Sequence, residues 1–211
     1  MTVKVALSGA GGNVGRILRV ELQKRGVSLR SAGGSKPLEP LHAGEDVMHG
    51  DLRDRAVVDR LLEGVDVLVH MAGTSVERPL PEIIDNNLVA LHLVYEGARR
   101  HKVRRVVFAS SNHAFGMHPS DARLELDADF RPDGFYGLSK VWGEAMARMY
   151  WDKHGIEGVM LRIGTTMGRP PENFRQLSTW MGSDDLVQLV MRAIEAKDMG
   201  YAAVWGISAK S

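Results

Sequence analysis

The strongest constraint on the fold lies near the N-terminus, where a short apolar stretch leads directly into a glycine-rich loop. Residues 3–7 have the apolar pattern of a strand, residues 8–15 carry the spacing G-x-x-G-x-x-G, and residues 16–24 have a helical pattern. Such a loop lets a pyrophosphate approach bare backbone and directs the amides of a helix N-terminus at the phosphates. A purely structural loop is the alternative. We predict nucleotide binding here, at Gly9, Gly12, Asn13, Val14 and Gly15.

Strand and helix patterns alternate along the rest of the chain. Expected strands are 3–7, 27–30, 45–49, 65–71, 104–111, 158–164 and 202–205, and expected helices are 16–24, 54–62, 81–100, one beginning at 134, and 184–196. This alternation predicts a parallel sheet whose two faces are both covered. The expected fold class is α/β, a Rossmann-type doubly wound parallel sheet flanked by helices on both faces. A chain of 211 residues with 44% hydrophobic content can bury one such core, so we expect a single domain over 1–211.

The composition excludes several classes of protein. Lys and Arg number 27 against 26 Asp and Glu, and this net charge of +1 does not indicate nucleic-acid binding. The basic cluster at 99–105 is interpreted as a helix end that leads into a strand. With no cysteine there are no disulfides or thiolate metal sites, and we expect no metal. The first residues lack a signal-peptide pattern and no apolar run could cross a bilayer, so a cytoplasmic protein without membrane contact is expected.

Several chemistry-bearing residues follow predicted strands, at the sheet edge where ligands bind in open parallel sheets. Asp51 and Leu52 follow the third strand, where an adenine would lie. Residues 72–73 follow the fourth strand, where missing side chains let a cofactor pass close to the backbone. Residues 111–113, Ser-Asn-His, follow the fifth. His70 is interpreted as a structural histidine rather than a ligand or acid.

The end of the second strand bears on the choice of cofactor. A dinucleotide fold selective for NAD usually carries an acid there, which bonds the ribose 2′-hydroxyl. Here residues 31–35 are small, and Arg30 and Lys36 flank this small segment. This arrangement leaves room and positive charge for a 2′-phosphate. The alternative is a flexible loop whose basic residues face water.

Tyr136 precedes Lys140 by four positions at the start of a predicted helix, so both side chains lie on one face. An unperturbed tyrosine, with a pKa of ~10, is a poor base at neutral pH. One ammonium at about 4 Å in an effective dielectric near 20 contributes roughly the energy needed to lower that pKa by two to three units. The pair therefore predicts a tyrosine base. The alternative is a helix that packs its tyrosine and exposes its lysine.

Ser111 precedes Tyr136 by 136 − 111 = 25 positions. The intervening residues 116–133 are polar and contain proline, which indicates a loop that can bring the serine beside the tyrosine.

The predicted helix 81–100 is apolar around most of its circumference. A surface helix shows one apolar stripe, so we expect a second cover, such as the same helix of another copy of the chain. Asn87 lies within this helix, either bonded to backbone groups or water near the active site or with a structural role only.

With the glycine loop, Ser111, Tyr136 and Lys140 in this order, the chain resembles the extended short-chain dehydrogenase/reductase superfamily, the NAD-dependent epimerase/dehydratase group. The resemblance implies that Tyr136 is the acid/base, that Lys140 lowers its pKa and holds the nicotinamide ribose, and that Ser111 steadies the reacting oxygen. These roles agree with the chemistry, because a hydroxyl must lose its proton as hydride leaves the same carbon. The NAD site expected on this basis comprises Gly9, Gly12, Asn13, Val14, Gly15, Asp51, Leu52, Met71, Ala72, Gly73, Tyr136, Lys140 and Ile163.

A closer resemblance, to the uronate dehydrogenases, covers nearly all of the chain. It rests on residues 73–79, 108–113, 131–140, 162–164 and 177–180. These enzymes oxidise the anomeric carbon of galacturonate or glucuronate to an aldarolactone. The resemblance therefore implies an NAD(P)-dependent dehydrogenase that acts on a sugar acid. From the apolar helix 81–100 we also expect a homo-oligomer, a dimer or larger.

The same resemblance implies that Arg175 grips the substrate carboxylate, a role that suits a guanidinium because it can donate two charge-assisted hydrogen bonds. A surface cap is the alternative for Arg175. The other substrate-binding residues that it implies are Ser75, Ser111, Asn112, His113 and Thr165.

The chain departs from the family pattern at two points. Gly33 stands where these enzymes carry the ribose-binding aspartate, so NADP is open beside NAD. Only 211 − 140 = 71 residues follow Lys140, fewer than in the family, so we expect a reduced C-terminal substrate-binding region and poor turnover. The substrate-binding elements are then expected mainly in 73–80, 111–120 and 164–182.

Two other functions compete with this one. A nucleotide-sugar epimerase, dehydratase or reductase is the enzyme alternative, but such enzymes use a sizeable C-terminal lobe and little chain remains for one. A non-catalytic NAD(P) sensor is the alternative from another class. Sensors of this type tend to lose the tyrosine or the lysine, and both are present here.

Overall fold

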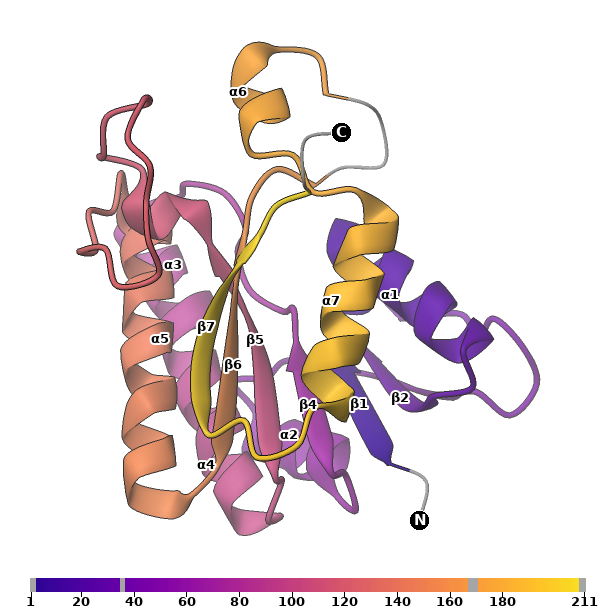
Figure 1. Cartoon of the computed structure of the whole chain (residues 1–211). Coiled ribbons are helices and arrows are strands. Elements are labelled where there is room, and N and C mark those ends of the chain that lie inside the picture. Colours follow the sequence, from indigo (N-terminus) through magenta and orange to yellow (C-terminus); the bar gives the residue numbers. More distant parts are fainter. Residues whose placement is uncertain (1–2, 35–36, 167–170, 209–211) are drawn as a thin grey trace.

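The protein is organised around one parallel β-sheet, seen in a computed structural model that describes residues 3–34, 37–166 and 171–208 (Figure 1). Within these residues the sheet has seven strands in the order β3-β2-β1-β4-β5-β6-β7. The strands are β1 (Lys4–Ser8), β2 (Ser28–Gly33), β3 (Asp46–His49), β4 (Val67–His70), β5 (Arg105–Ser111), β6 (Glu157–Ile163) and β7 (Tyr201–Gly206). Every neighbouring pair is parallel, which confirms the predicted doubly wound α/β fold.

Helices cover both faces of the sheet. On one face lie α1 (Asn13–Lys24) and α7 (Ser183–Glu195), and on the other lie α2 (Arg55–Leu62), α4 (Ala90–Arg100) and α5 (Phe135–His154) (Figure 1). Shorter helical segments are α3 (Leu80–Ile83), the π-helix η1 (Ile84–Val89), the 3₁₀-helix η2 (Asn112–Phe115) and α6 (Phe174–Ser178). The chain winds outward from β1 to β3 and then crosses to β4, so the switch point lies between β1 and β4.

The core consists of two apolar layers, one on each face of the sheet. In β1, Val5 and Leu7 pack in the layer beneath α1 and α7, whereas Ala6 between them packs in the layer beneath α2, α4 and α5. Strands covered on both faces carry continuous apolar runs, as β1 and β4 do. Each fully buried Val or Leu side chain contributes about 1.5–3 kcal/mol to the free energy of unfolding, relative to an exposed one.

The second strand is longer than the sequence predicted. β2 continues to Gly33, so residues 31–33 are paired in the sheet and do not form a loop. Arg30 bonds Asp46 at 2.7 Å and donates to carbonyl oxygens at the end of α2. The prediction that Arg30 lends positive charge to a 2′-phosphate is therefore wrong, because its guanidinium is committed to β3 and α2. Lys36 lies outside the described residues.

The predicted helix 81–100 is not a regular α-helix. It consists of α3, the π-helix η1 and α4 in succession, and the amide of Ala90 donates to the carbonyl of Asp85, five residues back. π-helical turns often mark functional sites. Here the wider turn contains Asn87, which is buried.

The polar loop 116–133 lies where the sequence predicted it, between η2 and α5, and one buried arginine holds it against the sheet. Arg162 of β6 pairs with Glu144 of α5 at 2.9 Å and donates to the carbonyl of Leu126 in the loop at 2.8 Å. Glu144 also accepts a hydrogen bond from Ser110 of β5. The rings of Phe115, Phe130 and Trp205 surround the guanidinium at 4.4–5.5 Å.

No helix in the described part of the chain is long and apolar enough to cross a membrane. Among the same residues, no group of three or more His, Asp or Glu side chains is placed to hold a metal ion.

Candidate active site

The glycine loop is fixed by close approach of backbone to backbone. Gly9 has a φ of 73°, and a Cβ at this position would lie 2.7 Å from the backbone of Met71 and Ala72, at the end of β4. A Cβ at Gly15 would overlap the carbonyl of Gly9. Because Gly12 is the N-cap of α1, the first free amides of that helix face the turn. The loop therefore has the bare backbone that a pyrophosphate requires.

A cavity of about 480 Å³ opens beside this loop at the carboxyl edge of the sheet. Small residues and backbone amides dominate its wall, which suits a group with phosphates and two ribose rings. The lining residues are Ser8, Gly9, Gly12, Ala32, Gly33, Gly34, Gly50, Asp51, Leu52, Arg53, Met71, Ala72, Gly73, Thr74, Asn86 and Ala90.

Asp51 contributes a carboxylate to the cavity wall and is held by Arg53. The Arg53 amide and guanidinium both donate to it, and these hydrogen bonds hold the pKa of Asp51 below its usual range. The guanidinium also reaches Asp85 at 3.4 Å. Two carboxylates therefore keep the Arg53 charge at this wall.

Most of the predicted cofactor residues line the cavity or adjoin the glycine loop. Asn13 and Val14 form the first turn of α1. Ile163 lies instead in the core beneath α7, at the end of β6, where it pairs in register with Ser111.

The structure brings Ser111, Tyr136 and Lys140 together, although they come from β5 and α5. Ser111 is the last residue of β5, and its side chain favours ionisation of the nearby Tyr136 phenol, which lowers the pKa of that phenol. The Lys140 Nζ lies 5.4 Å from the centre of the Tyr136 ring and 4.9 Å from that of Phe108. The loop 116–133 thus brings Ser111 beside Tyr136, as the sequence predicted.

The pKa values of Lys140 and Tyr136 differ from the sequence prediction. Burial lowers the pKa of Lys140 to about 8. The pKa of Tyr136 is raised, because burial and the negative charge of Asp133 outweigh the hydrogen bond from Ser111. The expectation that Lys140 lowers the tyrosine pKa is not met in this structure, since a desolvated ammonium against the ring face does not offset the burial of the phenol.

Three of the predicted substrate-binding residues, His113, Asn112 and Arg175, form a connected group around Ser111 and Tyr136. The His113 ring meets the Tyr136 ring edge-on at 5.5 Å, and the Arg175 guanidinium of α6 lies 3.5 Å from His113 Nε2. Asn112 accepts from the Ser111 hydroxyl at 3.3 Å.

The other two predicted substrate-binding residues, Thr165 and Ser75, are less closely linked to this group. Thr165 bonds the Thr179 hydroxyl at 2.9 Å, which joins the end of β6 to the segment that carries Arg175. Ser75 is exposed, and no hydrogen bond among the described residues links it to the tyrosine.

Two further residues shape the site. Asn87 accepts from the Thr74 amide at 2.7 Å and donates to Ser139, which in turn bonds the carbonyl of Tyr136. Glu77 accepts from the amides of Phe135 and Tyr136 and so caps α5. Reasoning from the sequence left Asn87 open and missed Glu77, because the acid lies 58 positions before the helix that it caps.

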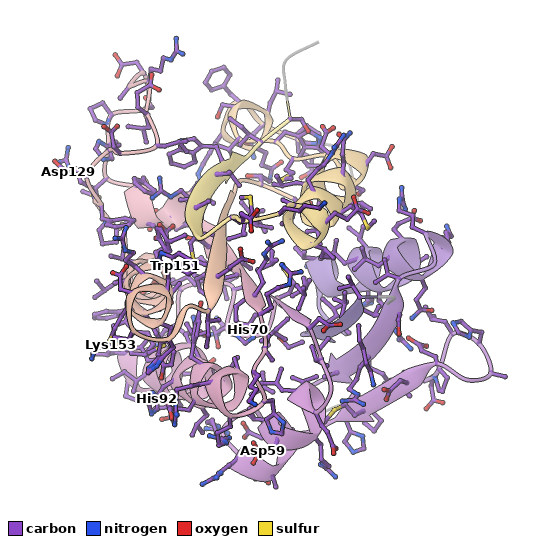
Figure 2. All side chains as sticks on the ribbon, turned by 60° about the horizontal axis from the view of Figure 1, so that its bottom comes forward. Asp59, His70, His92, Asp129, Trp151 and Lys153 are labelled. Carbon is purple, nitrogen blue, oxygen red and sulfur yellow. The ribbon has the colours of Figure 1, made fainter. Side chains whose placement is uncertain are left out.

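His70 has the structural role predicted for it. The ring is buried, bonds the Ser8 hydroxyl at 2.8 Å and stacks on Phe108, in the interior of the molecule (Figure 2). Burial lowers its pKa to about 3, so the imidazole is neutral at physiological pH.

Comparison with known proteins identifies the families that this site matches. Residues 5–181 match the model of the NAD dependent epimerase/dehydratase family. The chain is 43% identical over 206 residues to a uronate dehydrogenase of Agrobacterium fabrum, a match that covers 98% of this chain and 77% of that protein. It is 42% identical over 205 residues to a uronate dehydrogenase of Pseudomonas syringae, covering 97% and 74% respectively.

A solved structure agrees with these matches. The fold superposes with a TM-score of 0.93 on a mutant of the uronate dehydrogenase of Agrobacterium tumefaciens complexed with NAD. The two chains are 41% identical, and the match covers 99% of this chain and 78% of the other.

The buried ammonium of Lys140 makes stability depend on pH. The pKa is about 8 in the folded protein and 10.5 in the unfolded chain, so between these values the unfolded chain binds more protons and stability rises with pH. Below pH 8 the full cost is present, about 3 kcal/mol at 1.36 kcal/mol per unit. Lys140→Met should therefore be more stable than the unmodified protein at pH 7, with the difference shrinking toward pH 10.5. Urea unfolding without added nucleotide measures this.

Lys153→Met is the matched control, because Lys153 lies on the outer surface of the same helix (Figure 2). It should change stability by a similar small amount at both pH values. An equal effect of Lys140→Met at pH 7 and pH 10.5 would contradict a lowered Lys140 pKa.

Proposed function

The chain belongs to the uronate dehydrogenases of the NAD dependent epimerase/dehydratase family, and we propose that Tyr136 is the base with which it oxidises a hexuronic acid at the anomeric carbon. The protein is an NAD-dependent oxidoreductase that acts on a CH–OH group, and the product is the aldarolactone. The observation that carries this proposal is the placing of Tyr136, with the Lys140 Nζ 5.4 Å from the centre of its ring and the His113 ring edge-on at 5.5 Å.

The proposed chemistry divides between cofactor and protein. When bound, the nicotinamide accepts the hydride from the anomeric carbon. The Tyr136 oxygen takes the proton of the anomeric hydroxyl, and the Ser111 hydroxyl holds the same oxygen in line. Lys140 lies against the tyrosine ring and is assigned to the nicotinamide ribose. Because the pKa of Tyr136 is raised in the structure, the rate of oxidation should rise with pH as the phenolate forms.

The proposed substrate contacts come from three segments, 73–80, 111–120 and the described part of 164–182. Arg175 binds the carboxylate, since its guanidinium reaches the edge of His113 and has no carboxylate partner among the described residues. The sugar hydroxyls are assigned to Ser75, Ser111, Asn112, His113 and Thr165. Four of these five belong to the connected group around Tyr136 and α6.

The substrate can be tested by following reduced cofactor with NAD and a panel of sugars. Galacturonate and glucuronate should be oxidised. Galactose, which lacks the carboxylate, should have a kcat/KM roughly 10–100-fold lower, because a hydrogen bond to a charged group contributes about 1.5–3 kcal/mol. UDP-galactose in the panel tests the nucleotide-sugar alternative, and turnover of it in preference to the uronates would contradict the proposal.

Tyr136→Phe tests the base in the same assay and should lower kcat by about 10²–10⁴-fold. Tyr201→Phe is the control, because it removes a phenol from β7, outside the group around Ser111. Full turnover by Tyr136→Phe would remove Tyr136 from the chemistry.

We also propose that NADP is accepted beside NAD, as two features of the cavity suggest. Gly33 and Gly34 line its wall at the end of β2, so β2 supplies no carboxylate there to bond a ribose 2′-hydroxyl or repel a 2′-phosphate. The Arg53 guanidinium lines the same wall, where a 2′-phosphate can compete for it with its present partners Asp51 and Asp85. From the nicotinamide cofactor we further propose a cytoplasmic setting.

Gly33→Asp should shift the preference toward NAD. The new carboxylate can accept a hydrogen bond from the 2′-hydroxyl and repels a 2′-phosphate, so KM for NADP should rise about tenfold or more while KM for NAD falls. Steady-state kinetics with both cofactors measure the ratio. Gly33→Asn is the isosteric control and should leave the ratio closer to that of the unmodified chain. A strong NAD preference before any substitution would contradict the proposal.

We propose finally that the protein is a homo-oligomer built on the outer face of α3, η1 and α5. Two neighbouring stripes of apolar side chains are exposed there. One consists of Leu80, Ile84 and Val89, and the other of Leu138 and Met149 on α5, with the half-buried Trp142 between them. Exposed apolar stripes on adjacent helices suit a contact between copies of the same chain.

Val89→Glu combined with Met149→Glu should convert the oligomer to monomer, because each copy would then bury charges without partners. Sedimentation velocity at micromolar concentration measures this. Leu41→Glu is the control, since Leu41 is 51% exposed on the loop before β3. An unmodified chain that sediments as a monomer would contradict the proposal.

A further inference from the structure

Asp133 has a defined place beside the tyrosine that no role assigned so far explains. It lies two residues before α5, at the end of the loop 116–133. Its carboxylate Oδ2 is 2.8 Å from Nδ1 of His113, and its amide donates to the His113 carbonyl at 3.3 Å. Asp133 therefore holds both the ring and the backbone of a residue expected to contact substrate.

Two glycines make room for this pair. A Cβ at Gly116 would overlap the Asp133 carboxylate, and a Cβ at Gly137 would overlap the His113 carbonyl. Neither glycine has a φ in the left-handed region, so their backbone conformation does not require glycine. What requires glycine at both positions is the close approach of Asp133 and His113 to η2 and α5.

The pairing fixes which ring nitrogen of His113 carries the proton. An ionised carboxylate only accepts hydrogen bonds, so Nδ1 must donate to Asp133. A neutral imidazole has one donor and one acceptor nitrogen, and Nε2 is then the acceptor. The same nitrogen faces the Arg175 guanidinium, which only donates, at 3.5 Å. Both neighbours of the ring thus favour the same tautomer.

We propose that Asp133 is a positioning residue that holds His113 in the tautomer whose Nε2 accepts a hydrogen bond from a hydroxyl of the sugar acid. This inference rests on the proposed function for the identity of the substrate, whereas the tautomer itself does not depend on it. A sugar hydroxyl donates to Nε2 while the carboxylate of the same molecule is bound by Arg175. The pair then orients the ring of the substrate relative to Tyr136.

Asp133 acts on the base as well, because its charge contributes to raising the pKa of Tyr136. The other ionisable groups around the phenol are Lys140 on α5, His113 on η2, and Glu77, which caps the start of α5. Neutralising Asp133 at constant shape therefore has two separable effects. It weakens the hold on the His113 tautomer and it lowers the pKa of Tyr136.

Asp133→Asn tests both effects in the full chain. The neutral Asn amide can present either its oxygen or its NH₂ to Nδ1, so the tautomer is held less strongly and KM for galacturonate should rise, by up to about tenfold, the size of one lost hydrogen bond. KM for NAD should stay within about twofold. The rising acid limb of the kcat/KM profile should move to lower pH, because the phenolate forms more readily without the neighbouring negative charge. A purely structural role would not move that limb.

A readout without turnover separates this inference from the proposed function. Long-range ¹H–¹⁵N correlation on protein labelled at histidine reports the tautomer, with the His113 signals assigned by their loss in His113→Gln. Protonated Nδ1 in the unmodified protein and a larger share of protonated Nε2 in Asp133→Asn support the inference, whether or not a uronate is turned over. Protonated Nε2 in the unmodified protein would overturn it, even if galacturonate proves to be the substrate.

Gly116→Ala provides a second variant, because the new methyl group pushes the flexible carboxylate away from His113 but keeps its charge. It should raise KM for galacturonate and let His113 populate both tautomers. The acid limb of the kcat/KM profile should move less than in Asp133→Asn. Asp127→Asn, at an exposed position of the same loop, is the matched control and should leave KM, tautomer and pH profile unchanged. Equal changes in Asp127→Asn and Asp133→Asn would overturn the inference.

Discussion

The buried ion pair between Arg162 and Glu144 is the interaction on which the arrangement of the site depends. It joins β6 to α5, Glu144 extends it to β5 through Ser110, and Arg162 extends it to the loop through the Leu126 carbonyl. Breaking such a pair by removing one partner costs about 3–5 kcal/mol, because the other charge stays buried. The segments that carry the serine, the tyrosine and the lysine are thereby held by one network, and so is the loop that ends at Asp133.

Around this network, some buried charged groups have hydrogen-bonding partners, whereas others are desolvated without them. Arg162 has a carboxylate, a carbonyl and aromatic faces as partners, whereas the Lys140 ammonium is buried against two rings and its pKa falls. Tyr136 is likewise poorly solvated, and its pKa rises. Perturbed groups of this kind cluster at functional sites because the cost of desolvation can be recovered when a charged ligand arrives. The buried charge that supports the fold is therefore fully paired, whereas the groups proposed to carry the chemistry are desolvated and have shifted pKa values.

The sequence predicted those features that depend on short spacings. The glycine loop, the strand–helix alternation and the relation of Tyr136 to Lys140 are local, and the structure confirms their positions. Features that depend on tertiary packing were missed. The contacts of Arg30 with α2, the cap of α5 by Glu77 and the raised pKa of Tyr136 arise from burial and from residues distant in sequence. The roles assigned to Ser75, Thr165 and Arg175 stay predictions.

The π-helix between α3 and α4 has a consequence for how this protein can change in evolution. A π-helical turn contains one residue more than the α-helical turn it replaces. Deleting any single residue between Ile84 and Val89 would close the wide turn to a regular α-helical one, and the side chains within the turn would then take new directions. Asn87 could then not reach both Thr74 and Ser139. This segment should therefore tolerate many substitutions yet be intolerant of length variation, in contrast to the loops.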